Sequence, residues 1–149
     1  MDDSNIEVTQ MSIADLENIK DVLQSEFDDF WNYNIFKNEL TNIFSKYVVA
    51  KQYNTIVGFA GMQIILDEAT IMNIVTKATK RNSGIASKML EKLIDIAKDC
   101  NLKSITLEVN ENNTAAINLY KKYNFKQVGL RRKYYKNQDS AVLMTVELI

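Results

Sequence analysis

Hydrophobic residues recur along this chain with two different periods. Alternating apolar positions, which are typical of strands, occur in residues 5–11, 46–65 and 104–109. Apolar positions three and four residues apart, which are typical of one face of a helix, occur in residues 12–27, from about 34 on, from about 84 and in 113–123. The near-continuous apolar run "ATIMNIVTKA" (69–78) predicts a central strand covered on both faces.

Short polar signals predict where these elements begin and end. Ser12, with Asp15 three residues later, is a capping signature for the first helix. Asn112 or Asn113 caps the last helix. A turn at residues 53–55 joins two strands of the 46–65 segment, and "FKQVGLRRKYYK" and "SAVLMTVELI" form a closing antiparallel pair around "NQD".

The predicted order of elements is β-α-α-β-β-β-α-β-α-β-β. We therefore expect a mixed α/β (α+β) fold with a largely antiparallel central sheet and helices on both faces. The length of 149 residues fits one domain over 1–149.

Composition restricts the chemistry. The chain has no histidine, which excludes zinc sites built on histidine, serine–histidine triads and histidine general bases. Its one cysteine, Cys100, cannot form an internal disulfide and favours a reducing cytoplasm. No apolar run is long enough for a membrane span, and the acidic N-terminus is no signal peptide. Carboxylates, tyrosines or lysines must move any protons.

The net charge of −1 hides an asymmetry between the two halves. Residues 1–73 hold 4 Lys and Arg against 12 Asp and Glu, whereas residues 74–149 hold 14 against 7. One interpretation is solubility and attraction within the molecule. The other is that one half binds a polyanion and the other half receives a cation.

The segment "VTKATKRNSGIASK" (75–88) is the first candidate for chemistry. A glycine at a helix start lets the backbone approach a ligand, and the free N–H groups of the first turn favour a phosphate. The surrounding positive charge comes from Lys77, Lys80, Arg81 and Lys88. This piece alone fits a basic loop with a helix-starting Gly84 equally well.

The second candidate is "LEVNENNTAAINLYKKYNF" (107–125). Glu108 alternates with apolar residues and so points to the opposite face of its strand. Tyr120 lies on the apolar stripe of the next helix. Each residue alone reads as a solvated or a core side chain, but the pair flanks an asparagine-rich corner just after a phosphate-type loop.

With these motifs, the chain resembles the GNAT superfamily of acetyl-CoA-dependent N-acetyltransferases. More narrowly, it is similar to the RimI group of ribosomal-protein-alanine N-acetyltransferases. The segments that carry the resemblance are "LDEATIMNIVT" (66–76), "RNSGIASKMLEKLI" (81–94), "LEVNENNTAAINLYKKYNF" (107–125) and "RRKYY" (131–135).

The resemblance implies roles for individual residues. Glu108 would accept the proton of the incoming amine, and Tyr120 would protonate the departing thiolate of CoA. The residues that would hold acetyl-CoA are Ile74, Val75, Thr76, Arg81, Asn82, Ser83, Gly84, Ile85, Ala86, Ser87 and Asn113. The residues that would wall the acceptor cleft are Trp31, Tyr33, Tyr134 and Tyr135.

Some positions depart from the family pattern. Ala78 replaces a common proline, and Ala86 replaces the second glycine of the loop. Asn124 stands where glycine is usual and can take the same left-handed conformation. Lys133 replaces an asparagine that is common before the paired tyrosines, so the choice of substrate stays open at this position.

The function that follows is transfer of acetyl to the N-terminal amine of a protein, with an alanine-starting ribosomal protein as the expected partner. Neither a metal nor direct contact with nucleic acid or membrane is expected. Two alternatives stay open: a GNAT enzyme for a small amine, such as a polyamine or antibiotic, and a non-catalytic acyl-CoA-binding module.

Overall fold

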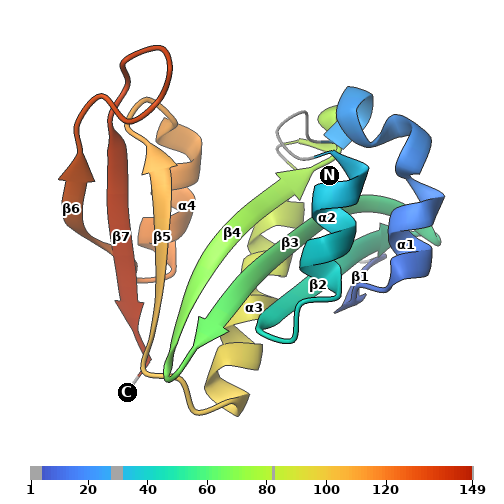
Figure 1. The fold of residues 1–149 in the computed structure, drawn as a ribbon, viewed down its shortest axis with the longest axis horizontal. Coiled ribbons are helices and arrows are strands. Elements are labelled where there is room, and N and C mark those ends of the chain that lie inside the picture. Colours follow the sequence, from blue (N-terminus) through green and yellow to red (C-terminus); the bar gives the residue numbers. More distant parts are fainter. Residues whose placement is uncertain (1–4, 28–31, 82, 149) are drawn as a thin grey trace.

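A computed structural model describes residues 5–27, 32–81 and 83–148 (Figure 1). The strands are β1 (Ile6–Gln10), β2 (Ser45–Gln52), β3 (Thr55–Ile65), β4 (Glu68–Thr76), β5 (Ser104–Asn110), β6 (Lys126–Arg131) and β7 (Ala141–Glu147). The α-helices are α1 (Ile13–Asn18), α2 (Tyr33–Leu40), α3 (Ile85–Asp99) and α4 (Thr114–Lys122). Short turns of 3₁₀ or π-helix lie at Lys20–Val22, Leu23–Phe27 and Ala78–Lys80.

The strands form one sheet in the order β1-β2-β3-β4-β5-β7-β6. All neighbouring strands are antiparallel except β4 and β5. The predicted order of elements and the largely antiparallel sheet are therefore confirmed. Among the described residues, no helix combines the length and the apolar character that crossing a membrane requires.

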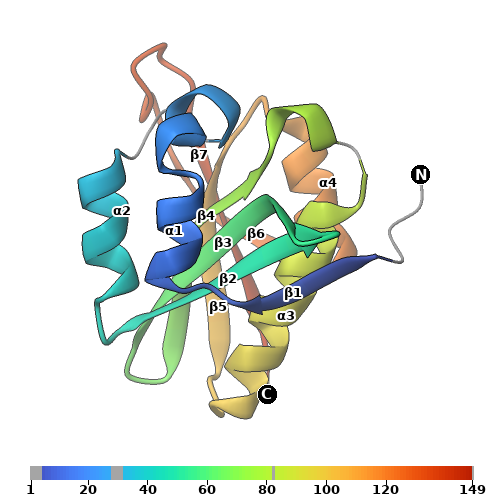
Figure 2. The ribbon, with the colours of Figure 1, turned by 90° about the vertical axis from the view of Figure 1, so that its right-hand side faces the viewer.

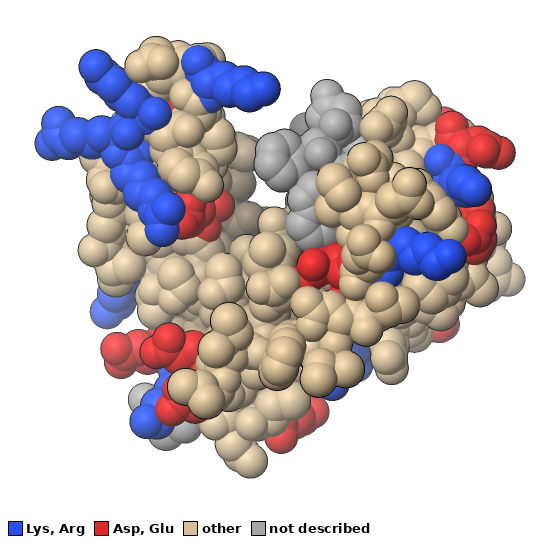
Figure 3. Space-filling model, viewed as in Figure 1, with Lys and Arg blue, Asp and Glu red and all other residues tan. Residues whose placement is uncertain are grey.

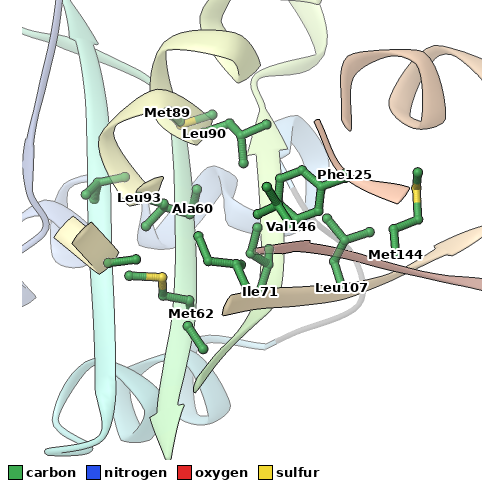
Figure 4. Close-up of a cluster of buried hydrophobic side chains, with 14 of the residues drawn as sticks. Ala60, Met62, Ile71, Met89, Leu90, Leu93, Leu107, Phe125, Met144 and Val146 are labelled. Carbon is green, nitrogen blue, oxygen red and sulfur yellow. The ribbon is translucent and has the colours of Figure 1, made fainter. Parts of the chain in front are cut away.

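Helices cover both faces of the sheet, as expected. Helices α3 and α4 lie on one face and α1 and α2 on the other (Figure 2). The larger core joins α3 to the sheet through buried side chains such as Met89, Leu90 and Leu93 (Figure 4). A second core, which includes Leu16 and Phe36, packs α1 and α2 against Phe59 of β3.

The local signals at the ends of elements are confirmed. Ser12 and Asp15 form the predicted capping box, in which each side chain bonds to the backbone of the other residue. Asn113 caps α4 by accepting a hydrogen bond from the N–H of Ala116. Asn124 takes the expected left-handed conformation, with φ of 72°.

Two expectations need correction. The helical stripe of residues 12–27 is not one helix, because α1 ends at Asn18 and gives way to 3₁₀ and π turns. Those turns still bury Leu23 and Phe27, so the hydrophobic spacing could not distinguish them from an α-helix. Strand β4 is not covered throughout, because Met72 is 39% exposed.

Candidate active site

The sheet opens between β4 and β5. Their parallel pairing covers only Glu68–Thr70 of β4, whereas β5 stays paired with β7 along its whole length. Beyond Thr70 the two strands diverge, as Figure 1 shows. The β4 side of this opening also contains a register shift, because Gly61 pairs with Asn73 and Met62 pairs with Ile71. The splay exposes strand backbone within the sheet, where it can bond to a ligand.

A cavity of about 250 Å³ fills this opening. Its walls are residues 71–74 of β4 and residues 107–110 of β5, together with Asn113, Tyr120 and Tyr135. Glu108 and Tyr120, the residues that the resemblance assigns to proton transfer, therefore line the same cavity.

A larger cavity of about 490 Å³ adjoins the first and shares Ile74, Asn113 and Tyr120 with it. Its other lining residues are Phe27, Val75, Thr76, Arg81, Gly84, Ala86, Ser87, Ala115, Ala116 and Leu119. It thus runs from the end of β4 to the N-termini of α3 and α4. Tyr120 stands where the two cavities meet.

The N-terminus of α3 opens toward the larger cavity. Gly84 caps this 15-residue helix with φ of 80°, a backbone conformation that glycine adopts without a steric penalty. The first-turn N–H groups, Ala86 and Ser87 among them, have no partner within the helix, and the helix dipole adds positive potential. Arg81 lines the same cavity, and together these groups offer the N–H donors and the positive charge that suit a phosphate group; we call them the phosphate cradle.

The structure separates the eleven predicted cofactor residues into three groups. Eight of them line the larger cavity: Ile74, Val75, Thr76, Arg81, Gly84, Ala86, Ser87 and Asn113. Ser83 and Ile85 are buried instead: the hydroxyl of Ser83 donates to the carbonyl of Lys80, and Ile85 packs in the larger core. Asn82 lies outside the described residues.

Glu108 is held by its strand with the carboxylate on the open face. Its neighbours Leu107 and Val109 point to the other face, into the core under α3. Oε1 of Glu108 lies 3.2 Å from Nε of Arg131, which reaches it from β6. The carboxylate thus faces the smaller cavity while bonded to a cation.

Tyr120 lies on α4 and packs against the ring of Phe125, with centroids 5.8 Å apart. Burial, with a smaller contribution from Tyr135, raises the pKa of Tyr120 to about 12. Its phenol therefore stays protonated at any pH near neutrality and can donate a hydrogen bond into either cavity.

The loop between β6 and β7 positions Tyr135 over this site. Asn110 at the end of β5 donates to Oδ2 of Asp139 over 3.1 Å, and this bond in turn lowers the pKa of Asp139. The N–H of Tyr135 donates to the carbonyl of Asp139 over 3.1 Å. Burial, and to a lesser extent the charge of Glu108, raises the pKa of Tyr135.

The four predicted acceptor residues have different locations. Tyr135 lines the smaller cavity. Tyr134, half exposed, packs edge-on against Tyr135 with centroids 5.1 Å apart. Tyr33 lines neither cavity: its hydroxyl donates to Glu17 and Lys20 sits 4.5 Å above its ring, so the structure does not place it in the cleft. Trp31 lies outside the described residues.

Asn73 was not predicted as a site residue. Both polar atoms of its side chain are buried and have no hydrogen-bond partner in the described part of the chain, and the residue lines the smaller cavity. Leaving a buried amide unpaired costs about 1–3 kcal/mol, so such groups call for an explanation and often mark functional sites. The signal in the sequence that could have indicated Asn73 is its place as the one amide within the apolar run of residues 71–75. Phe27, Ala115, Ala116 and Leu119 of the larger cavity were missed as well.

The charge asymmetry of the sequence appears on the surface. Figure 3 shows Lys and Arg gathered on the half that contains β6 and the loop after it, and a hollow between this half and the rest of the molecule. Oε2 of Glu26, in the acidic N-terminal half, lies 3.8 Å from Nζ of Lys77.

Comparison with known proteins identifies relatives of this arrangement. The model of the acetyltransferase (GNAT) family matches residues 11–125. The [ribosomal protein bS18]-alanine N-acetyltransferase of Haemophilus influenzae is 33% identical over 147 residues, which cover 95% of this chain and 98% of that protein. The crystal structure of the ribosomal-protein-S18-alanine N-acetyltransferase from Escherichia coli superposes with a TM-score of 0.86 at 27% identity, covering 95% of this chain and 93% of that chain.

Proposed function

The chain belongs to the GNAT family of acetyltransferases, and on that basis we propose that it moves acetyl from acetyl-CoA to the N-terminal α-amine of a protein. The observation that supports this most directly is the meeting of two cavities at Tyr120. One cavity has a phosphate cradle, and the other holds the carboxylate of Glu108. The donor and the acceptor would thus enter from opposite ends and react where the cavities meet.

Acetyl-CoA supplies the activated acyl group as a thioester. In this assignment the cradle of Arg81, Gly84 and Ser87 binds its pyrophosphate, and the unpaired backbone of β4 bonds to its pantetheine arm. Nothing in this scheme requires a metal or a covalent enzyme intermediate, because the thioester is already reactive toward a neutral amine.

Glu108 acts as the general base in this scheme. The acceptor must lose a proton before it attacks, and the carboxylate lies on the wall of the cavity that the acceptor enters. A protein α-amine has a pKa of about 8, so roughly a tenth of it is already neutral at pH 7. A lysine side chain, with a pKa near 10.4, is neutral to only about one part in a few thousand. A lone glutamate therefore favours an α-amine as the acceptor.

The protein that we propose as the acceptor is an alanine-starting ribosomal protein in the cytoplasm. The relatives from Haemophilus influenzae and Escherichia coli carry names that specify alanine of ribosomal protein S18. The acidic N-terminal half would attract a basic partner, and added salt would weaken that attraction.

An acetylation assay with matched acceptors tests this proposal. We expect efficient acetylation of an alanine-starting peptide, because its α-amine is easily deprotonated. The control is the same peptide blocked at its α-amine but still carrying lysines, on which we expect little activity. Equal rates on both peptides, or activity confined to polyamines, would reject the α-amine as the substrate.

The donor site has its own test in Gly84→Val. A branched side chain at φ of 80° is strained, and it would project into the pyrophosphate cradle. We expect the affinity for CoA, measured by titration calorimetry, to fall at least about tenfold. The control is Gly129→Val on β6, where an added Cβ meets its nearest neighbour, Leu143, at 3.8 Å. Unchanged affinity in folded Gly84→Val would disprove the assignment of the cradle.

A further inference from the structure

Glu108 is paired with a cation from the chain itself. Arg131 pairs with Ala141 of β7, and Glu108 pairs with Leu143 of the same strand, so the arginine side chain spans β7 to reach the carboxylate. The contact is made by Nε at 3.2 Å from Oε1. The arginine side chain is 56% exposed and that of Glu108 is 30% exposed, so the pair lies at the solvent side of the site.

The acceptor is also a cation when it arrives. About nine tenths of an α-amine with a pKa near 8 is ammonium at pH 7, and this ammonium must approach the carboxylate that Arg131 already contacts. We propose that the Arg131 guanidinium occupies the position of the acceptor ammonium in the free enzyme, so that acceptor binding exchanges one cation for the other. The proposal depends on the proposed function, because it takes Glu108 as the group that receives the amine.

The exchange suits the surroundings of Arg131. Its exposed guanidinium can return to water without being buried unpaired. Its Cζ lies 5.6 Å from the ring centroid of Tyr134, so a cation–π contact remains available after it leaves Glu108. The ammonium replaces the charge that departs, so Glu108 keeps a positive partner until the proton is transferred. The free enzyme thereby avoids an unpaired carboxylate in a partly enclosed cavity.

In this role Arg131 competes with the acceptor ammonium for the carboxylate of Glu108. Removing its charge should strengthen acceptor binding, whereas an arginine that helped to bind the acceptor would have the opposite effect. The factor is modest, because exposed ion pairs contribute little. For Arg131→Met, which keeps the apolar stem of the side chain, we expect the KM for an alanine-starting peptide to fall about two- to fivefold. The KM for acetyl-CoA should not change.

Arg132→Met is the matched control, because Arg132 is the next residue and is exposed. It removes the same charge from the same part of the surface, so it reports any general effect of net charge on a basic peptide. We expect it to leave the KM for the peptide within error of the wild-type value.

The proposal can also be tested by adding a guanidinium cation back to the variant that lacks Arg131. Methylguanidinium added to Arg131→Met should restore a cation at Glu108 and inhibit in competition with the peptide, with a much weaker effect on the wild type. An unchanged or raised KM in Arg131→Met, an equal fall in Arg132→Met, or the lack of competitive inhibition would overturn the proposal. Arg131→Gln gives the same reading if the methionine variant folds poorly.

Failure of the proposed function would look different. The wild type would then acetylate a small amine and show no activity on the alanine-starting peptide. The same variants can be measured with that amine, since the exchange concerns any acceptor that arrives as ammonium.

Discussion

Glu108→Gln should lower kcat/KM for an alanine-starting peptide by about 10²–10⁴-fold at pH 7, the usual contribution of a positioned acid or base. Glutamine keeps the shape of the side chain but cannot accept the proton of the amine. The substitution also removes the ion pair with Arg131, which lies at the surface and contributes at most about 1 kcal/mol to stability. The variant should therefore fold normally, and affinity for CoA should be kept.

The dependence of this loss on pH identifies its cause. Between pH 7 and pH 9 the neutral fraction of an α-amine rises from about a tenth to about nine tenths. A variant without the base benefits from that rise, so its deficit relative to the wild type should shrink about tenfold. The exposed Glu147 at the end of β7 supplies the control variant Glu147→Gln, which should behave as the wild type does. A deficit that stays constant with pH would mean that Glu108 positions the substrate and does not act as a base.

Short-range patterns predicted most of the fold because short-range chemistry determines it. The capping box at Ser12, the cap at Asn113 and the left-handed Asn124 each depend on backbone geometry within a few residues. The alternation of strands and helices then left few ways to arrange a largely antiparallel sheet. The π turn that ends at Phe27 escaped prediction because it buries the same stripe that a helix would bury.

The site was predicted less completely, because its details depend on contacts between distant strands. Glu108 and Tyr120 could be assigned through the resemblance, and they do line one cavity. The contact of Arg131 with Glu108 depends on the register of β6 and β5 on either side of β7, which no local pattern specifies. The sequence could not show that Ser83 and Ile85 are buried while Gly84, Ala86 and Ser87 line the larger cavity.

Tyr120→Phe should lower kcat by about 10- to 100-fold, less than the loss of the base, while affinity for CoA is largely kept. The phenol has a pKa of about 12, which lies well above the value of about 8.5 for the thiol of a cysteine side chain. Full proton transfer from the tyrosine to the leaving sulfur is therefore uphill, and its main contribution is a hydrogen bond to the charge that develops there. Such a bond stabilises the transition state more than the bound substrates, so kcat should change more than KM.

The raised pKa of Tyr120 also predicts the shape of the pH profile. A group whose pKa is raised keeps its proton to higher pH, so the neutral phenol persists through the range from pH 6 to pH 10. Titration of Tyr120 should therefore not lower kcat in this range. The pH profiles of the wild type and of Tyr120→Phe should have the same shape between pH 6 and pH 10. Tyr53→Phe, in the turn between β2 and β3, is the control, because that hydroxyl accepts a hydrogen bond from Nδ2 of Asn5 over 2.6 Å and lies outside the two cavities that form the site. If Tyr120→Phe retains full kcat, the tyrosine contributes only to the wall between the two cavities, and the leaving thiolate departs without help from the protein.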